Sequence, residues 1–310
     1  IGGWPLLTKR DVRRAGAGMI NSTGRGRVHQ TRASGSTGSP QSFYTNSLRN
    51  SYAVANWIRA WRWWGLDYGM KVLKVWGDPR VKGLSSWGKL VTRVKWLKDT
   101  AIGTHQVSSF ETRNEELESI CDAIQRFRPD VVFGYGVALY LLASHIARKG
   151  MGHLAHKPRL VIYTAETLFD AQKELVEATF CAPCVAEYGS RECGIIAYEC
   201  PGRQLHLNDE SLFSQVIDES DNPLSSGIGQ LVLTDLFWSR TPYIRYVLGD
   251  IVELAPRGYR CSCGRGLKVI IGLRGRNNEV IWRADGSSVH PLIFFQILRD
   301  LEGLRRFQVR

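Results

Sequence analysis

Residues 184–192 read CVAEYGSRE, and this stretch decides how the chain is expected to fold and where a ligand is expected to bind. Residues 184–187 have the character of a short buried strand, which ends at Tyr188 and Gly189. A tyrosine at the carboxyl end of a strand can present a flat face to a base. A glutamate four residues later, Glu192, can reach a Mg²⁺ ion that bridges phosphates. Taken alone, the stretch favours a simpler interpretation, a surface turn with an exposed acid.

The sequence before this stretch alternates between helices and short strands. Residues 111–126 have the pattern of an amphipathic helix, and Pro129 follows it. The segments that come next are a strand at 131–133, a helix at 137–149, a strand at 160–163 and a helix at 169–179. Short strands separated by helices predict an α/β fold with a parallel sheet, in which ligands bind beyond the carboxyl ends of the strands.

The flanking regions differ in character. Residues 1–30 look irregular, and residues 45–64 look helical, with Trp57, Trp61 and Trp64 on one face, where we expect core packing. After residue 200 the pattern changes to β segments joined by turns, at 214–218, 230–234, 244–247, 251–254 and 268–271. A strand-like segment at 279–282 and a helix at 291–301 follow.

Composition and charge narrow the possible functions. The chain has 310 residues, a length typical of about two domains, and 44% hydrophobic residues exclude a mainly disordered chain. The sequence has no run of about 18 apolar residues, so we predict no membrane span. The first 100 residues carry 18 Lys and Arg against 4 Asp and Glu, whereas the remainder carries 23 against 25. The basic part is either a solvated surface or attracts anions, and without a nucleic-acid-binding signature we expect phosphate-bearing small molecules, not nucleic acid.

A Ser/Thr/Gly-rich loop lies within this basic part. It lacks the Gly-Lys-Ser/Thr ending of a Walker loop and does not match a dinucleotide fingerprint. Its glycines allow backbone N–H groups to turn toward an anion, and its hydroxyls add donors. The loop is therefore either a phosphate-binding loop or an ordinary polar connection; its residues are Ser34, Gly35, Ser36, Thr37 and Gly38.

Two further residues follow β segments. Asp250 comes after Gly249, where a carboxylate can accept two hydrogen bonds from a ribose diol, and an ordinary turn aspartate is equally compatible. Arg276, in the stretch Gly-Arg-Asn-Asn, can pair with phosphate or ribose.

Seven cysteines in a chain of this size, with no signal peptide in view, indicate a reducing compartment. One C-x5-H pair and one C-x-C pair together offer three thiolates and one imidazole, a donor set that suits a closed, structural Zn²⁺ site. The alternative is buried cysteines near a surface histidine. Cys181 and Cys184 form a C-x2-C pair that we interpret as core. The predicted zinc ligands are Cys200, His206, Cys261 and Cys263.

The four motifs, in this order, resemble the adenylate-forming enzymes, and most of all the phenylacetate–CoA ligase family and its capsular-polysaccharide-biosynthesis relatives. Further stretches match the family's landmarks, namely 5–11, 133–136, 164–166, 199–200, 229–234, 242–250 and 261–265. The resemblance implies an α/β adenylate-forming large domain at residues 1–276, whose β-rich part at 200–275 is held by zinc. A hinge and the beginning of a small C-terminal domain would follow at 277–310. We expect a chain truncated at both ends, without the lysine of the small domain, so that the fragment itself lacks full activity.

The resemblance also assigns roles to residues. The Ser34–Gly38 loop would hold the phosphates of ATP, and Glu192 would bind Mg²⁺. Residues Ala186, Glu187, Tyr188 and Gly189 would line the adenine and acyl region. Asp250 and Arg276 would bind the ribose, Arg276 with a further role at the phosphates, and Asn278 would be the hinge. Gln41 and Asn278 depart from the family, which often has Lys and Asp at these positions.

The implied reaction has two steps. A carboxylate attacks the α-phosphate of ATP, and coenzyme A then takes the acyl group from the adenylate. One alternative is transfer to another acceptor in surface polysaccharide assembly, and another is a non-catalytic, zinc-containing relative. The partners implied are a small carboxylic acid, ATP, Mg²⁺ and coenzyme A in the cytoplasm. The sequence fixes neither the acid nor the oligomeric state.

Overall fold

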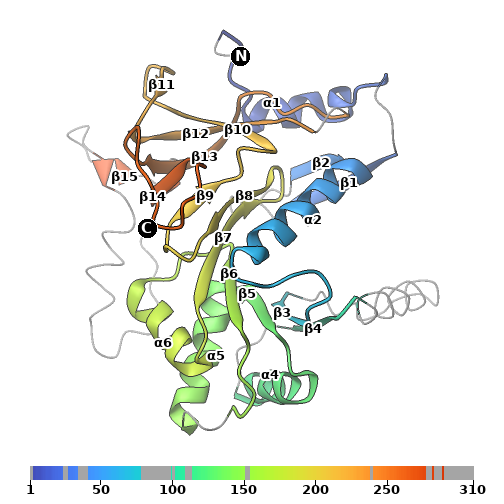
Figure 1. Cartoon of the computed structure of the whole chain (residues 1–310). Helices are drawn as coiled ribbons and strands as arrows, with labels where there is room; N and C mark the ends of the chain where they lie inside the picture. The colour runs from blue at the N-terminus through green and yellow to red at the C-terminus, as the bar shows by residue number, and fades with distance from the viewer. Residues whose placement is uncertain are drawn as a thin grey trace. The chain divides into compact units, whose positions relative to one another are not determined.

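In the computed structural model the chain forms two units, which are described separately (Figure 1). The α/β unit is Ala53–Leu205, and the β-rich unit combines Ile1–Tyr52 with His206–Arg310. The structure describes residues 3–23, 27–33, 41–77, 99, 102–108, 114–150, 154–237, 240–276, 281–282 and 288–289. The predicted phosphate loop, Asn278 and the predicted helix at 291–301 lie outside these ranges.

The α/β unit is built on six neighbouring strands in the order β8-β7-β6-β5-β3-β4. The first five in chain order are parallel, and β8 pairs antiparallel with β7. Their bounds are β3 Val72–Trp76, β4 Thr104–Ser108, β5 Val131–Tyr135, β6 Leu160–Thr164, β7 Cys184–Ser190 and β8 Gly194–Glu199. Strands β5 and β6 are buried almost throughout, as continuous apolar segments in a doubly covered parallel sheet should be.

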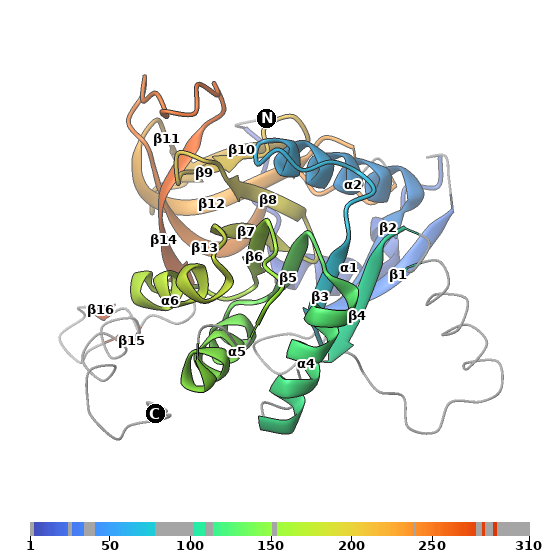
Figure 2. The ribbon, with the colours of Figure 1, turned by 60° about the horizontal axis from the view of Figure 1, so that its bottom comes forward.

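Helices cover both faces of this sheet. On one face lie α4 (Asn114–Phe127), α5 (Gly136–Lys149) and α6 (Asp170–Phe180), which Figure 2 shows side by side. On the other face the C-terminal part of α2 (Ser47–Arg62) packs its tryptophans against the sheet. The core therefore lies in two layers, one on each side of the strands.

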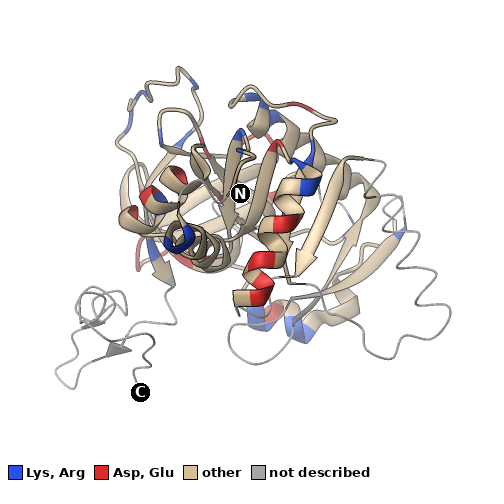
Figure 3. Ribbon diagram, turned by 90° about the horizontal axis from the view of Figure 1, so that it is seen from below, with Lys and Arg blue, Asp and Glu red and all other residues tan. Residues whose placement is uncertain are grey.

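Helix α4 shows why the sequence folds this way locally. Its apolar residues Leu117, Ile120 and Ile124 recur at helical spacing and are at most 4% exposed. Its acidic residues, red in Figure 3, include the exposed Glu115 and Asp122 on the solvent side. The amphipathic pattern thus determines which side of the helix faces the sheet.

The β-rich unit contains a second run of strands, in the order β11-β10-β12-β13-β14-β9, with antiparallel pairing from β11 to β14. Their bounds are β9 Leu205–Leu207, β10 Leu212–Ile217, β11 Pro223–Leu224, β12 Gly227–Asp235, β13 Tyr246–Leu254 and β14 Val269–Arg276. Strands β1 (Val28–Ala33) and β2 (Gln41–Asn46) form a separate antiparallel pair. Strands β15 (Ile281–Trp282) and β16 (Ser288–Val289) form another.

The N-terminal segment of the β-rich unit is more regular than predicted. It contains α1 (Lys9–Ala15), the short 3₁₀ helix η1 (Gly16–Met19) and β1. Helix α1 begins at a capping box in which Asp11 N donates to Thr8 Oγ1 and Thr8 N donates to Asp11 Oδ2. The Thr8 hydroxyl also donates to Asp11 Oδ2 at 2.6 Å, and this bond, followed by the one from Thr8 N, lowers the pKa of Asp11. The prediction that residues 1–30 are irregular was wrong, because this reciprocal cap is a short, local signal within a glycine-rich stretch.

The predicted alternation of strands and helices over residues 111–187 is present. Three predictions made for this region and for the residues after it need correction. Strand β7 continues to Ser190 instead of ending at Tyr188 and Gly189, because it turns directly back into β8, a strand that was not predicted. The predicted strands at 244–247 and 251–254 are one strand, β13. Cys181 is exposed at the end of α6, so only Cys184 of the C-x2-C pair belongs to the core. None of the helices in the described ranges is long and apolar enough to cross a membrane.

Candidate nucleotide and metal sites

The β7–β8 hairpin carries the residues that the sequence singled out first. Ala186, Glu187, Tyr188 and Gly189 lie on β7, and Glu192 lies in the turn between the two strands. Glu192 is 8% exposed, so it is a buried carboxylate and not the exposed acid of an ordinary surface turn. A buried carboxylate needs a partner for its charge, and Glu192 interacts with another group of the protein. Its burial contradicts the alternative of an exposed acid, and its role toward Mg²⁺ stays a prediction.

Three tryptophans from the α2 region fasten this hairpin. Trp57 Nε1 donates to Glu187 Oε2 at 2.7 Å, and Trp61 Nε1 donates to Tyr198 Oη at 3.0 Å. Trp64 Nε1 donates to the carbonyl oxygen of Glu199 at 2.9 Å. The prediction that these tryptophans pack in the core is confirmed, and their indole N–H groups add polar contacts that helical spacing alone does not reveal.

Glu187 is the group of the hairpin whose pKa is shifted to near neutral pH. Burial raises its pKa to about 7, while the hydrogen bond from Trp57 and the charge of Lys74 act in the opposite direction. Lys74 Nζ lies 5.2 Å from the centroid of a Trp57 ring, so a cation, an indole and a carboxyl group are gathered there. Glu187 thus changes its charge close to neutral pH, within the segment predicted to line the adenine and acyl region.

The raised pKa of Glu187 makes stability depend on pH. Below the ordinary carboxyl pKa both the folded and unfolded forms bind the proton, and as pH rises toward 7 only the folded form retains it, so stability falls. Compared with Glu187→Gln, which keeps an acceptor for Trp57, the natural chain should lose roughly 2–3 kcal/mol between pH 5 and pH 8. Urea unfolding of both proteins at several pH values measures this difference. Parallel pH curves for the two proteins would contradict it.

Gly189 is required where β7 and β8 approach each other. A Cβ atom at this position would lie 2.7 Å from the carbonyl oxygen of Gly194, a backbone atom that cannot move aside. The register of the two strands also shifts between Tyr188 and Gly189. The glycine therefore allows the close approach that places Tyr188 in the hairpin.

Gly189→Ala is expected to destabilise the fold by about 1–3 kcal/mol, because the hairpin must open to admit the methyl group. ATP binding should weaken in the same variant, since Tyr188 is displaced. Urea unfolding and ATP titration measure the two effects. Gly266→Ala is the matched control, because a Cβ atom there meets nothing within 4 Å. Equal stability of the two variants would contradict this prediction, because it would show that β7 and β8 can move apart at this position without a loss of stability.

Asp250 and Arg276 are brought together by the sheet of the β-rich unit. They are direct partners in the antiparallel register of β13 and β14. The prediction that Asp250 lies at the end of a strand was wrong, because Asp250 lies inside β13 at an irregularity. Val247 pairs with Val232 there, and Ile251 pairs with Gln230. Extra residues on β13 form a bulge there, and Gly249 adopts a φ of 94° that favours glycine. A bulge of this kind redirects side chains, which explains why the Gly-Asp pair looked like a strand end.

The predicted phosphate loop joins β1 and β2. These strands pair from Val28 and Asn46 to Ala33 and Gln41, so residues 34–40 connect the two strands of a hairpin. The loop residues Ser34 to Gly38 themselves lie outside the described ranges, and their role remains a prediction.

The predicted zinc ligands lie together. Cys200, His206 and Cys261 are buried, and Cys263 is partly exposed. The ligand atoms of all four residues lie within 4.8 Å of one another. Around tetrahedral Zn²⁺, with Zn–S bonds of about 2.3 Å, two sulfur atoms are separated by roughly 3.8 Å. The observed spacing is therefore compatible with a closed four-ligand site.

The orientation of His206 also fits a metal ligand. Its Nδ1 lies 3.3 Å from the carbonyl oxygen of Leu267, and its Nε2 lies 3.2 Å from Cys263 Sγ. An Nδ1–H group that donates to a backbone carbonyl leaves the Nε2 lone pair directed toward the thiols, the arrangement that metal-binding histidines usually adopt. His206 is fully buried, which contradicts the alternative of a surface histidine.

Comparisons with known proteins show what this architecture is similar to. No protein-family model matches the chain. Protein CapK of Staphylococcus aureus is 25% identical over 302 residues, which are 96% of this chain and 64% of the relative. The chain thus spans somewhat less than two thirds of the length of this relative.

Solved structures share the fold at low sequence identity. The open conformation of 2-hydroxyisobutyryl-CoA ligase, in complex with 2-HIB-AMP and CoA, aligns with a TM-score of 0.68 at 16% identity, covering 96% of this chain and 70% of that one. ATP-bound MatB from Rhodopseudomonas palustris aligns with a TM-score of 0.60 at 16% identity, covering 89% and 53%. The anthranilate CoA ligase AuaEII, in complex with anthranoyl-AMP, aligns with a TM-score of 0.57 at 14% identity, covering 85% and 50%.

The chain therefore has the α/β fold of adenylate-forming CoA ligases, as the sequence motifs predicted. Within that class its sequence is similar to Protein CapK over nearly its whole length. The resemblance that was stated on the motifs is confirmed at this level.

Proposed function

We propose that this chain is the ATP-binding part of an enzyme that adenylates a carboxylic acid and passes the acyl group to coenzyme A. The observation that carries the proposal is the buried Glu192 in the turn directly after Tyr188 and Gly189, on a fold shared with ligases. Solved relatives of this fold hold acyl-adenylates, ATP or CoA. Their complexes support both halves of the proposed reaction.

The first half-reaction joins the acid to AMP. A carboxylate oxygen attacks the α-phosphorus of ATP, the bond to the bridging oxygen breaks, and pyrophosphate leaves. In the second half-reaction a thiolate attacks the acyl carbon, and AMP leaves with the oxygen that came from the acid. The thiol proton passes to solvent or to a base, so both steps balance without any oxidant or reductant.

The residues of this chain take separate roles in the proposal. Ala186, Glu187, Tyr188 and Gly189 line the adenine and acyl region. The facing residues Asp250 and Arg276 hold the ribose, and the loop from Ser34 to Gly38 holds the phosphates. Glu192 is placed to hold Mg²⁺, which would offset the negative charge of the phosphates. We assign Asn278 to a hinge between a large domain at 1–276 and the start of a small domain at 277–310.

The four-ligand cluster is proposed to bind a structural Zn²⁺ ion. Three cysteines and one histidine fill a tetrahedral coordination shell, so no position is left for a reactive water. Such an ion would join the turn after β8 to the turn between β13 and β14. The use of seven cysteines in a chain of this size and the need for ATP support a reducing, cytoplasmic location.

A second acceptor is favoured by one observation. The chain is similar in sequence to Protein CapK, and its motifs resemble the capsular-polysaccharide-biosynthesis relatives of the phenylacetate–CoA ligase family. The acyl group would then pass to another nucleophile, such as a sugar or a carrier in surface polysaccharide assembly. In both cases the first half-reaction is the same.

The proposal is tested by ATP–pyrophosphate exchange across a panel of carboxylic acids, using the complete protein. Exchange that requires the acid is the expected result, and AMP release on adding coenzyme A would select the thioester route. Exchange without AMP release to coenzyme A favours the second acceptor. ATP binding with no exchange for any acid of the panel would favour a non-catalytic relative.

A further inference from the structure

The first residues of β7 pair along their backbone with β6, but on the side of β8 they are held by side chains. The ladder between β7 and β8 runs from Ser190 and Gly194 to Glu187 and Tyr198. One residue beyond, Ala186 N donates to the carboxylate oxygen Oε2 of Glu199 at 2.8 Å. A side chain of β8 thus replaces the main-chain acceptor at the residue that begins the predicted nucleotide-binding segment.

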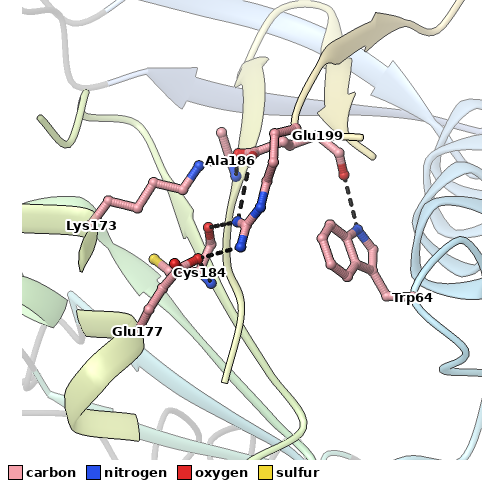
Figure 4. Close-up of polar contacts among 7 residues, drawn as sticks. Trp64, Lys173, Glu177, Cys184, Ala186 and Glu199 are labelled. Atoms are coloured by element: carbon pink, nitrogen blue, oxygen red, sulfur yellow. Dashed lines mark hydrogen bonds and ion pairs between the residues drawn. The ribbon is translucent and has the colours of Figure 1, made fainter. Parts of the chain in front are cut away.

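The backbone of Glu199 has a different partner. Its carbonyl oxygen accepts the indole N–H group of Trp64 at 2.9 Å, on the side opposite to the carboxylate contacts (Figure 4). Trp64 therefore holds the main chain of β8 at Glu199, and the carboxylate of Glu199 is available to hold β7. One residue connects three elements of the α/β unit.

The carboxylate of Glu199 is itself fixed by charge. Lys173 Nζ from α6 lies 2.6 Å from Oε1, and Arg203 Nη1 lies 3.6 Å from the same oxygen. The Glu199 side chain is 5% exposed and that of Lys173 is 19% exposed, so solvent screens this pair only weakly. A buried carboxylate with two cationic neighbours and a main-chain donor has little freedom to move.

A second carboxylate provides a natural comparison. Glu177 Oε1 accepts from Cys184 N at 2.8 Å and pairs with Arg203 Nη2 at 2.7 Å. Arg203 Nη1 also donates to the carbonyl oxygen of Cys184 at 3.0 Å. Both carboxylates form ion pairs with the guanidinium group of Arg203 (Figure 4). Glu177 and Glu199 each accept one N–H group of β7. Glu177 holds Cys184, whereas Glu199 holds Ala186, which directly precedes Glu187 and Tyr188.

We propose that Glu199 is a positioning residue for ATP: its carboxylate, by reaching Ala186 N, sets the place of the β7 segment that receives the nucleotide. The inference rests on the proposed function, because it assigns Ala186 to Tyr188 to that nucleotide. Glu199 touches no substrate in this role and acts through Ala186. Reach matters more than charge in this arrangement, since on the side of β8 Ala186 is held by the main-chain hydrogen bond to Glu199 and not by the ion pair.

The test compares variants that separate reach from charge. Glu199→Asp keeps the charge but is one methylene too short to reach Ala186, and it should raise the KM for ATP at least tenfold while kcat changes less than threefold. Glu199→Gln keeps the length and an acceptor oxygen, and its KM should lie well below that of Glu199→Asp. Glu177→Asp, the same change at the outer carboxylate, should leave the KM for ATP within twofold of the natural protein.

The readouts are ATP–pyrophosphate exchange and the dissociation constant of Mg·ATP, with the melting temperature as a measure of folding. If Glu199→Asp does not fold, Glu199→Asn against Glu199→Gln makes the same comparison of length without the charge, and only the shorter side chain should raise the KM for ATP. A wild-type-like KM for Glu199→Asp, or equal effects at both glutamates, would overturn the inference. If the natural protein neither binds ATP nor exchanges, the proposed function fails instead, independently of the variants.

Discussion

Glu192→Gln is expected to lower acid-dependent ATP–pyrophosphate exchange by a factor of 10² or more, the scale at which loss of a key electrostatic contact slows an enzyme. The proposed role of Glu192 needs a full negative charge toward Mg²⁺, which the amide cannot supply. The turn itself should survive, because Cys193 N donates to Ser190 Oγ at 2.9 Å and this contact does not involve Glu192. The loss should therefore appear in exchange and not in folding.

The control for this prediction is Glu174→Gln, at an exposed acid on α6 in the same unit. It removes the same charge without touching the hairpin and should leave exchange unchanged. Melting temperatures of both variants should stay close to that of the natural protein. Retained exchange in Glu192→Gln would refute the assignment of Mg²⁺ to this residue.

Loss of the metal is expected to have the largest effect on stability. Freshly purified protein that has not met a chelator should contain about one Zn²⁺ per chain, and Cys261→Ser should lose it. Structural Zn²⁺ contributes on the order of 10 kcal/mol in small peptides, and even a third of that would lower the melting temperature by about 5 °C in a chain of this size. Metal analysis and thermal unfolding measure the two results.

Cys181→Ser is the matched control for the metal, because this thiol is exposed and lies outside the four-ligand cluster. It should retain the metal and the melting temperature. Absence of zinc from the natural protein would end the zinc assignment, even though the four ligands lie together. An equal loss of stability in both serine variants would assign the effect to the thiols and not to an ion.

The sequence was most informative where a pattern repeats. The spacing of Leu117, Ile120 and Ile124 in α4, and the apolar runs of β5 and β6, follow from the need to cover a sheet on both faces, and they were predicted. The metal cluster was also predicted, because the chemistry of thiolates and imidazole is specific even when the residues are about 55 positions apart. Such signals depend on residue type and period, which a single sequence displays directly.

The sequence was least informative where one residue has two roles. Glu187 and Glu199 look like ordinary strand acids, yet one has its pKa raised by burial and the other holds the main chain of β7. Strand β8 escaped prediction because its apolar run follows a charged turn without a clear boundary. Asp250 looked like a strand end because its bulge is created by the register against β12, which is a property of two strands and not of one. These features arise from tertiary pairing.

The central claim is that a carboxylate oxygen of the substrate becomes bonded to the α-phosphorus of ATP. The most direct measurement uses a carboxylic acid labelled with ¹⁸O in both oxygens, turned over by the complete protein with ATP and an acyl acceptor, followed by mass analysis of the products. The account predicts AMP that carries one ¹⁸O atom per turnover, whichever acceptor takes the acyl group. Unlabelled AMP, or ¹⁸O in inorganic phosphate released together with ADP, would contradict it.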